Sequence, residues 1–141
     1  MSVDVFLDTN VLVYAVDTDP GAQAKRDRAR QLIRDDRFGT SAQVVQEFYV
    51  TVTRKLAKPL VPGVAARWVD RLTRMPFVPT DAILLKTAIV RAEAWQIPYW
   101  DAAVISAAEA LGAKTLFTED LNDGQLYGTV RVVNPFTTSS L

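Results

Sequence analysis

Short runs of β-branched and apolar residues alternate with longer amphipathic segments, and this alternation restricts the fold more than any other feature of the sequence. The expected strands cover 3–7, 38–40, 76–79, 114–118 and 130–133, and the expected helices cover 10–16, 20–35, 41–57, 64–74, 80–96 and 98–112. Strands that alternate with helices pair in parallel and carry helices on both faces of the sheet. The sequence therefore predicts an α/β protein with a mostly parallel sheet.

The length and composition predict one domain. The 141 residues contain no repeat and no linker-like segment, so residues 1–141 are expected to form a single domain with a polar tail at 137–141. No apolar run approaches the roughly 20 residues that cross a membrane. The first six residues have no basic segment, so they do not predict a signal peptide. We expect a cytoplasmic protein with no membrane partner.

The chain contains no histidine and no cysteine, and this restricts its chemistry. The absence of these residues excludes serine and cysteine catalytic triads, thiolate metal sites and most zinc sites. Carboxylates, hydroxyl groups, lysines and arginines remain, together with any metal ion that the carboxylates bind. The formal net charge is zero, so the overall charge gives no general attraction to nucleic acid.

Four acidic residues lie close to the ends of expected strands. Asp8 ends the first strand, Asp120 follows the strand at 114–118, Glu47 is in the second turn of the helix after 38–40, and Asp101 begins the last helix. Ligands of parallel α/β sheets bind beyond the carboxyl ends of the strands. We therefore expect these four side chains to meet at one edge of the sheet.

Carboxylates that meet there need a compensating charge. Two of them about 5 Å apart repel by roughly 3 kcal/mol at an effective dielectric constant near 20. Oxygen ligands without histidine or cysteine favour Mg²⁺ or Mn²⁺ as the compensating ion. Taken singly, the acids also have structural interpretations, namely an N-cap (Asp8), a solvent-facing helix acid (Glu47), a first-turn dipole partner (Asp101) and a turn residue (Asp120).

Four ordered motifs, taken together, resemble the PIN domain and, within it, the VapC-type toxins of prokaryotic toxin–antitoxin pairs. The motifs are LDTNVL at 7–12, SAQVVQEF at 41–48, WDA at 100–102 and LFTEDL at 116–121. The resemblance implies a three-layer α/β/α domain, Mg²⁺- or Mn²⁺-dependent endoribonuclease activity on RNA, a cognate antitoxin as partner, and a homodimer.

The resemblance also implies roles for individual residues. Asp8, Glu47, Asp101 and Asp120 match the acidic catalytic and metal-binding positions of the family. Asn10 and Thr118 match positions that orient the carboxylates or a water molecule. Within 119–123 the fourth acid is ambiguous, because Glu119, Asp120 and Asp123 all lie there. Asp120 is the favoured residue, and Asp123 is the alternative.

Arg26, Arg30 and Arg34 recur every four residues and predict a cationic ridge on one helix face. The ridge is a candidate surface for RNA or a protein partner, and a solvated helix face is the alternative.

Two other functions remain open within the family, a nuclease of RNA processing or decay with no toxin role and a catalytically silent binding module. A dehalogenase-like phosphatase with Asp8 as nucleophile fits poorly, because its motif needs an aspartate where Asn10 stands.

Overall fold

The structure is a computed structural model that describes residues 3–35 and 37–137. Its elements are β1 (Val5–Leu7), α1 (Thr9–Val16), a 3-10 turn (Pro20–Ala22), α2 (Gln23–Asp35), β2 (Phe38–Ser41), α3 (Ala42–Arg54), α4 (Pro62–Thr73), β3 (Phe77–Val78), α5 (Ala82–Trp95), α6 (Tyr99–Ala110), β4 (Thr115–Phe117), β5 (Leu126–Tyr127) and β6 (Val130–Val133). Most of the predicted tail, residues 138–141, lies outside the described residues.

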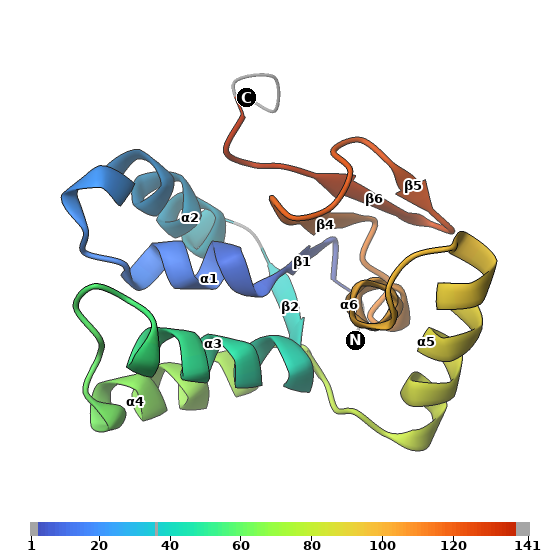
Figure 1. The fold of residues 1–141 in the computed structure, drawn as a ribbon, viewed down its shortest axis with the longest axis horizontal. Coiled ribbons are helices and arrows are strands. Elements are labelled where there is room, and N and C mark those ends of the chain that lie inside the picture. Colours follow the sequence, from blue (N-terminus) through green and yellow to red (C-terminus); the bar gives the residue numbers. More distant parts are fainter. Residues whose placement is uncertain (1–2, 36, 138–141) are drawn as a thin grey trace.

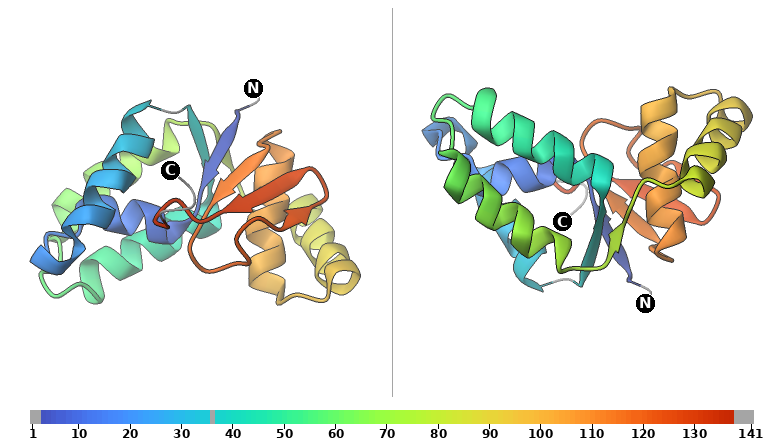
Figure 2. Two further views of the ribbon diagram at one scale, coloured as in Figure 1. Left: turned by 90° about the horizontal axis from the view of Figure 1, so that it is seen from above. Right: turned by 90° about the horizontal axis from the view of Figure 1, so that it is seen from below.

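The sheet has the order β3-β2-β1-β4-β6-β5, and all neighbours are parallel except β5 and β6. Figures 1 and 2 show α1, α2, α3 and α4 on one side of the sheet and α5 and α6 on the other. The predicted three-layer α/β/α fold is confirmed. The short strand β5 was not predicted; it forms a hairpin with β6 around Gly128, whose φ of 60° is readily adopted by glycine.

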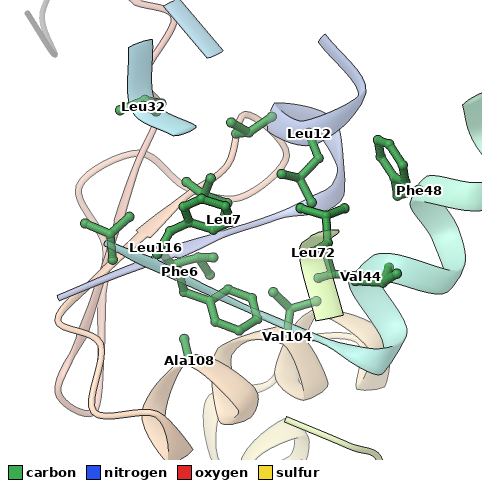
Figure 3. Close-up of a cluster of buried hydrophobic side chains, with 14 of the residues drawn as sticks. Phe6, Leu7, Leu12, Leu32, Val44, Phe48, Leu72, Val104, Ala108 and Leu116 are labelled. Carbon is green, nitrogen blue, oxygen red and sulfur yellow. The ribbon is translucent and has the colours of Figure 1, made fainter. Parts of the chain in front are cut away.

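The central strand β1 is covered on both faces, and all three of its residues are buried. Phe6 points toward Val104 and Ala108 of α6 (Figure 3), and its partner in the neighbouring strand β4 is Leu116. A strand that is buried on both faces reads as a continuous apolar run, and the sequence has such a run at this point. The core therefore holds the end of β1 in a fixed position, where the chain continues into Asp8.

Side-chain caps fix where several helices begin. The sequence predicts Ser41, at the start of the expected helix 41–57, as an N-cap. The Ser41 hydroxyl accepts a hydrogen bond from Val44 N at 3.3 Å, which confirms it as the N-cap of α3. For α5 the sequence predicts Thr80, at the start of the expected helix 80–96, as the N-cap. This prediction is wrong, because Asp81 accepts from Leu84 N at 2.8 Å. Aspartate and threonine are both good caps, so their order in the sequence did not decide between them. Among the described residues no helix is long and apolar enough to cross a membrane.

A methyl group at Gly39 is expected to destabilise the protein, because β2 passes close to its neighbours there. A Cβ atom would lie 3.2 Å from Val3 Cγ2 and 3.3 Å from Pro76 O, and it would overlap a methyl group of Leu111. Gly39→Ala should lower the free energy of unfolding by about 1–3 kcal/mol. In α4 nothing lies within 4 Å of the corresponding atom at Gly63. Gly63→Ala is therefore the control and should stabilise the protein by up to about 1 kcal/mol. Urea unfolding measures both changes, and equal effects would contradict the packing argument.

Candidate metal centre

Asp8 lies at the end of β1 with 9% of its surface exposed, and both of its carboxylate oxygens accept hydrogen bonds. Oδ1 accepts from Thr9 N at 2.8 Å, so Asp8 is the N-cap of α1. Oδ2 accepts from the Thr118 hydroxyl at 2.8 Å, just after β4. The N-cap interpretation of Asp8 is thus confirmed, and the same side chain joins the ends of two neighbouring strands.

Asn10 and Thr118 connect Asp8 to Asp120. The Asn10 side-chain amide donates to Thr118 Oγ1 and to Asp120 Oδ2, both at 3.0 Å. Thr118 Oγ1 also accepts from Asp120 N at 3.2 Å, and Glu119 N donates to Asn10 Oδ1 at 3.4 Å. Asn10 and Thr118 therefore hold the loop after β4 against the start of α1 and fix Asp120 beside Asp8.

Glu47 reaches the same region from α3 and is exposed to solvent. Its carboxylate accepts from the Thr9 hydroxyl and from the Gln43 side-chain amide, each at 3.3 Å. Gln43 also donates to Trp100 O at 3.3 Å, directly before Asp101 in α6. Sequence reasoning missed Thr9 and Gln43. The contact between Gln43 and Glu47 could have been predicted, because the two residues are four apart in one helix and so lie on the same face.

The acidic side chains are close enough to affect one another's ionisation. Burial raises the pKa of Asp8 from 3.8 to about 6, the hydrogen bonds from Thr9 and Thr118 oppose this rise, and the charges of Asp120 and Glu47 add to it. Burial also raises the pKa of Asp101, and the charges of Asp120 and Glu47 raise it further. The structure thus brings the four predicted acids into one electrostatically coupled group, which we call the acid cluster.

The other acids after β4 have separate partners. Glu119 accepts from the Tyr14 hydroxyl at 2.6 Å and from Lys25 Nζ at 2.9 Å. Lys25 also lies 4.8 Å from the centre of the Tyr14 ring, so α1 and α2 together compensate the charge of Glu119. Asp123 accepts from Asn134 N at 2.8 Å in a turn of its own. Of the three candidates for the fourth acid, Asp120 is the one whose carboxylate accepts a hydrogen bond from Asn10.

The acid cluster lacks such compensation. Within residues 3–35 and 37–137 no lysine or arginine forms an ion pair with any of its four acids. The same residues contain no group of three or more acidic side chains that could hold a metal ion as they stand. The donor set nevertheless fits a hard divalent cation, because it consists of oxygen atoms and includes a buried carboxylate whose charged form is disfavoured.

The predicted cationic ridge on α2 has a structural use. Arg26 donates to Asp17 O at 2.7 Å and to Asp19 O at 3.3 Å, and Arg30 Nε donates to Ala15 O at 2.8 Å. These carbonyl groups lie at or just after the C-terminal end of α1, where no intrahelical donor is present. Arg34 lines a hollow beside α4. The role of the ridge in binding RNA or a partner stays a prediction.

Comparisons with known proteins bear on the same fold. The family model described as "PIN domain" matches residues 5–124. A search of curated proteins finds no match. VapC20 of Mycobacterium tuberculosis, a toxin that cleaves the sarcin–ricin loop, is 20% identical with a TM-score of 0.63, over 83% of this chain and 92% of that chain.

Two solved toxin–antitoxin assemblies also resemble the chain. A toxin–antitoxin complex from Klebsiella pneumoniae is 16% identical with a TM-score of 0.67, over 94% of this chain and 98% of that chain. VapBC2 of Rickettsia felis, bound to a DNA fragment from its promoter, is 19% identical with a TM-score of 0.59, over 91% of this chain and 96% of that chain. These likenesses show a shared fold.

A rise in pH from about 4 to 7 is expected to destabilise the metal-free protein through Asp8. The folded-state pKa of about 6 lies above the ordinary 3.8, so the folded protein favours the protonated form. The stabilisation from protonated Asp8 is complete below the ordinary pKa and is lost as the pH rises through the folded-state pKa. The shift corresponds to roughly 3 kcal/mol in the free energy of unfolding. Urea unfolding in EDTA across this pH range measures the slope.

The control is Asp8→Asn, which cannot titrate and should flatten that slope. Its stability at pH 7 is not expected to rise by the full amount. Thr118 Oγ1 already accepts from Asn10 and Asp120 N, so an amide nitrogen at position 8 would find no free acceptor there. If the wild type and the variant had the same slope, the burial of a charged Asp8 would not be the cause.

Proposed function

Because the chain belongs to the PIN domain family, we propose that it is a metal-dependent endoribonuclease and the toxin of a VapBC-type pair. The observation that carries this proposal is the acid cluster. Asp8, Glu47, Asp101 and Asp120 repel one another there, and no lysine or arginine in the described part of the chain forms an ion pair with them. A cluster of uncompensated carboxylates suits a site that binds cations, and the bound cations would in turn stabilise a phosphodiester substrate. A silent binding module has no need for such repulsion.

The residues of the cluster have separate proposed roles. Asp8 and Asp101 are the principal ligands of Mg²⁺ or Mn²⁺, Glu47 assists, and Asp120 completes the site. A bound ion of this kind lowers the pKa of a water molecule and neutralises charge that develops on the phosphate. Asn10 and Thr118 keep Asp120 and Asp8 in fixed orientations through the hydrogen bonds described above. Because these supports come from the start of α1 and from the residue directly after β4, the ligand geometry depends on the sheet.

The cognate antitoxin is proposed to cover an apolar hollow of about 540 Å³ between α3 and α4. An adjoining hollow shares Gln46 and Val50 with it and is also lined by Glu47. An apolar helix of the antitoxin that lies in the first hollow would end beside the acid cluster and block it. The solved neighbours from Klebsiella pneumoniae and Rickettsia felis are themselves toxin–antitoxin complexes, which supports this assignment. The lining residues are Val45, Gln46, Tyr49, Val50, Ala66 and Val69.

The expected homodimer stays a prediction, and α5 is its candidate interface. This helix lies at the edge of the molecule against α6 (Figure 1). Ile83, Ile89 and Val90 are half or more exposed on it. A helix that is apolar on its outer side as well as its inner side is usually covered by another element. A second copy of the chain is the proposed cover.

Cleavage of RNA is expected to require both the acid cluster and a divalent ion. Asp101→Asn should lower the cleavage rate more than about a hundredfold, because even groups that only support metal ligands are worth about 10–100-fold. EDTA should abolish cleavage of total RNA by the wild type, and Mn²⁺ should restore it. Mapping the cut ends on gels measures the activity and identifies the substrate. Cleavage that persists in EDTA would exclude the metal-dependent mechanism.

Asp123→Asn is the matched control for this experiment. Its side chain accepts from Asn134 N, and asparagine keeps an oxygen that can do the same. This variant should cleave RNA at the wild-type rate, and a large loss would make Asp123 the fourth acid in place of Asp120.

Induced expression in a bacterial host separates the toxin from a nuclease of RNA processing. The toxin should arrest growth, and Asp101→Asn should relieve that arrest.

A further inference from the structure

A second concave surface lies between α2 and α4, apart from the acid cluster. One hollow of about 490 Å³ and another of about 240 Å³ adjoin there, and they share Trp68 and Arg71. The C-terminal parts of α2 and α4 lie side by side in both views of Figure 2. We call this surface the arginine groove, and its polar and aromatic lining consists of Arg30, Arg34, Arg67, Trp68 and Arg71.

The described side chains that line the arginine groove carry one sign of charge. Four arginines line the two hollows, and no acidic residue is among the lining side chains that the structure describes. The Arg71 guanidinium lies 5.2 Å from the centre of the Trp68 ring, which places a cation against an aromatic face. Arg30 uses Nε to bind Ala15 O. In a chain with zero net charge, this concentration of arginine is a local feature and not a consequence of composition.

The chemistry of the groove suits a nucleic-acid backbone better than a protein segment. Guanidinium groups bind phosphates through paired hydrogen bonds, and bases stack on tryptophan and arginine planes. Most of the exposed large apolar side chains, which suit a protein partner, lie away from the groove, notably at Tyr49 and Val50 of α3 and on α5, although Val61, directly before α4, lies close to it. The observations therefore favour RNA over a protein as the occupant of the arginine groove.

The groove is too far from the acid cluster to hold the bond that is cleaved. Ala15, which lines the groove, follows Asp8 by seven residues, or about 10 Å along α1. The groove residues lie in the second half of α2 and from the middle of α4 onward, and both helices run toward the edge where the strands begin (Figure 2). The acid cluster lies at the opposite edge, where β1 and β4 end. RNA bound in the groove is thus outside the cleaved segment.

We propose that the arginine groove is an exosite that binds the phosphate backbone of the RNA substrate beyond its cleavage site. This inference rests on the proposed function for the identity of the RNA as substrate. The exosite contributes to affinity for long RNA and takes no part in the chemical step. A short oligonucleotide that occupies only the acid cluster does not reach it.

The test compares Arg67→Gln/Arg71→Gln with the wild type on two RNAs, a stem–loop of about 30 nucleotides and a single strand of about 5. With Mn²⁺ present, the double variant should raise KM for the stem–loop about tenfold, leave its kcat unchanged, and cleave the short strand normally. Binding of the stem–loop in EDTA, followed by fluorescence anisotropy over a salt series, gives a readout without catalysis. The slope of log affinity against log salt should become less steep by about 2, or about 1 for each arginine.

Arg74→Gln is the matched control, because Arg74 also lies at the end of α4 but forms an ion pair with Asp70. It should change neither KM nor the salt slope. Both variants are at exposed positions, and their unfolding temperatures should equal that of the wild type. Glutamine retains good helix propensity, which keeps α4 intact.

Three results would overturn the exosite. If KM and the salt slope of the double variant equal those of the wild type, the groove does not bind RNA. If the variant loses affinity for both RNAs equally, the groove belongs to the cleavage site. If polyglutamate displaces the stem–loop from the wild type at lower concentration than a second RNA does, the occupant is an acidic protein segment. By contrast, a wild type that binds the stem–loop but cleaves neither RNA contradicts the proposed function and leaves the groove as an RNA-binding surface.

Discussion

The site depends on one buried carboxylate, that of Asp8, and on the strand pairing that surrounds it. β1 and β4 are in register at Leu7 and Phe117, and Asp8 N donates to Phe117 O at 3.1 Å. This pairing puts the side chains that follow the two strands, Asp8 and Thr118, within hydrogen-bond distance. A shift of the register by one residue would turn Thr118 to the other face of the sheet and leave Asp8 without its donor. The apolar core that fixes β1 therefore also fixes the geometry of the acid cluster.

Asp8 balances two opposite effects. The backbone N–H of Thr9 and the hydroxyl of Thr118 stabilise its charged form, whereas burial and the charges of Asp120 and Glu47 disfavour it, and the raised pKa shows that the second group prevails. A carboxylate of this kind is well oriented but incompletely compensated. The structural role of Asp8 as an N-cap and its proposed role as a ligand are thus compatible, because the cap keeps the oxygens in place and does not neutralise them.

The sequence predicted those features that follow from chain order and strand direction. Residues after parallel strands meet at one edge, so the meeting of Asp8 and Asp120 needed only the strand assignments. The contacts of Glu119 with Tyr14 and Lys25 could not be predicted in this way, because they join side chains 94 and 105 residues apart whose directions depend on helix packing. The hairpin at β5 was missed for a different reason, because a strand of two residues has too little periodicity to detect.

The distribution of arginine and lysine separates two kinds of surface on a chain with zero net charge. Lys25 compensates the charge of Glu119, which lies next to the acid cluster, and forms no ion pair with the four acids of the cluster itself in the described part of the chain. Arg26 and Arg30 bind carbonyl groups at the end of α1 that is opposite to Asp8. As a result α1 has carboxylates at its N-terminal end and guanidinium groups at its C-terminal end, which is the arrangement that the helix dipole favours. The same helix thus stabilises both the acid cluster and the cationic side of the molecule, and a single short element keeps the two charge types apart.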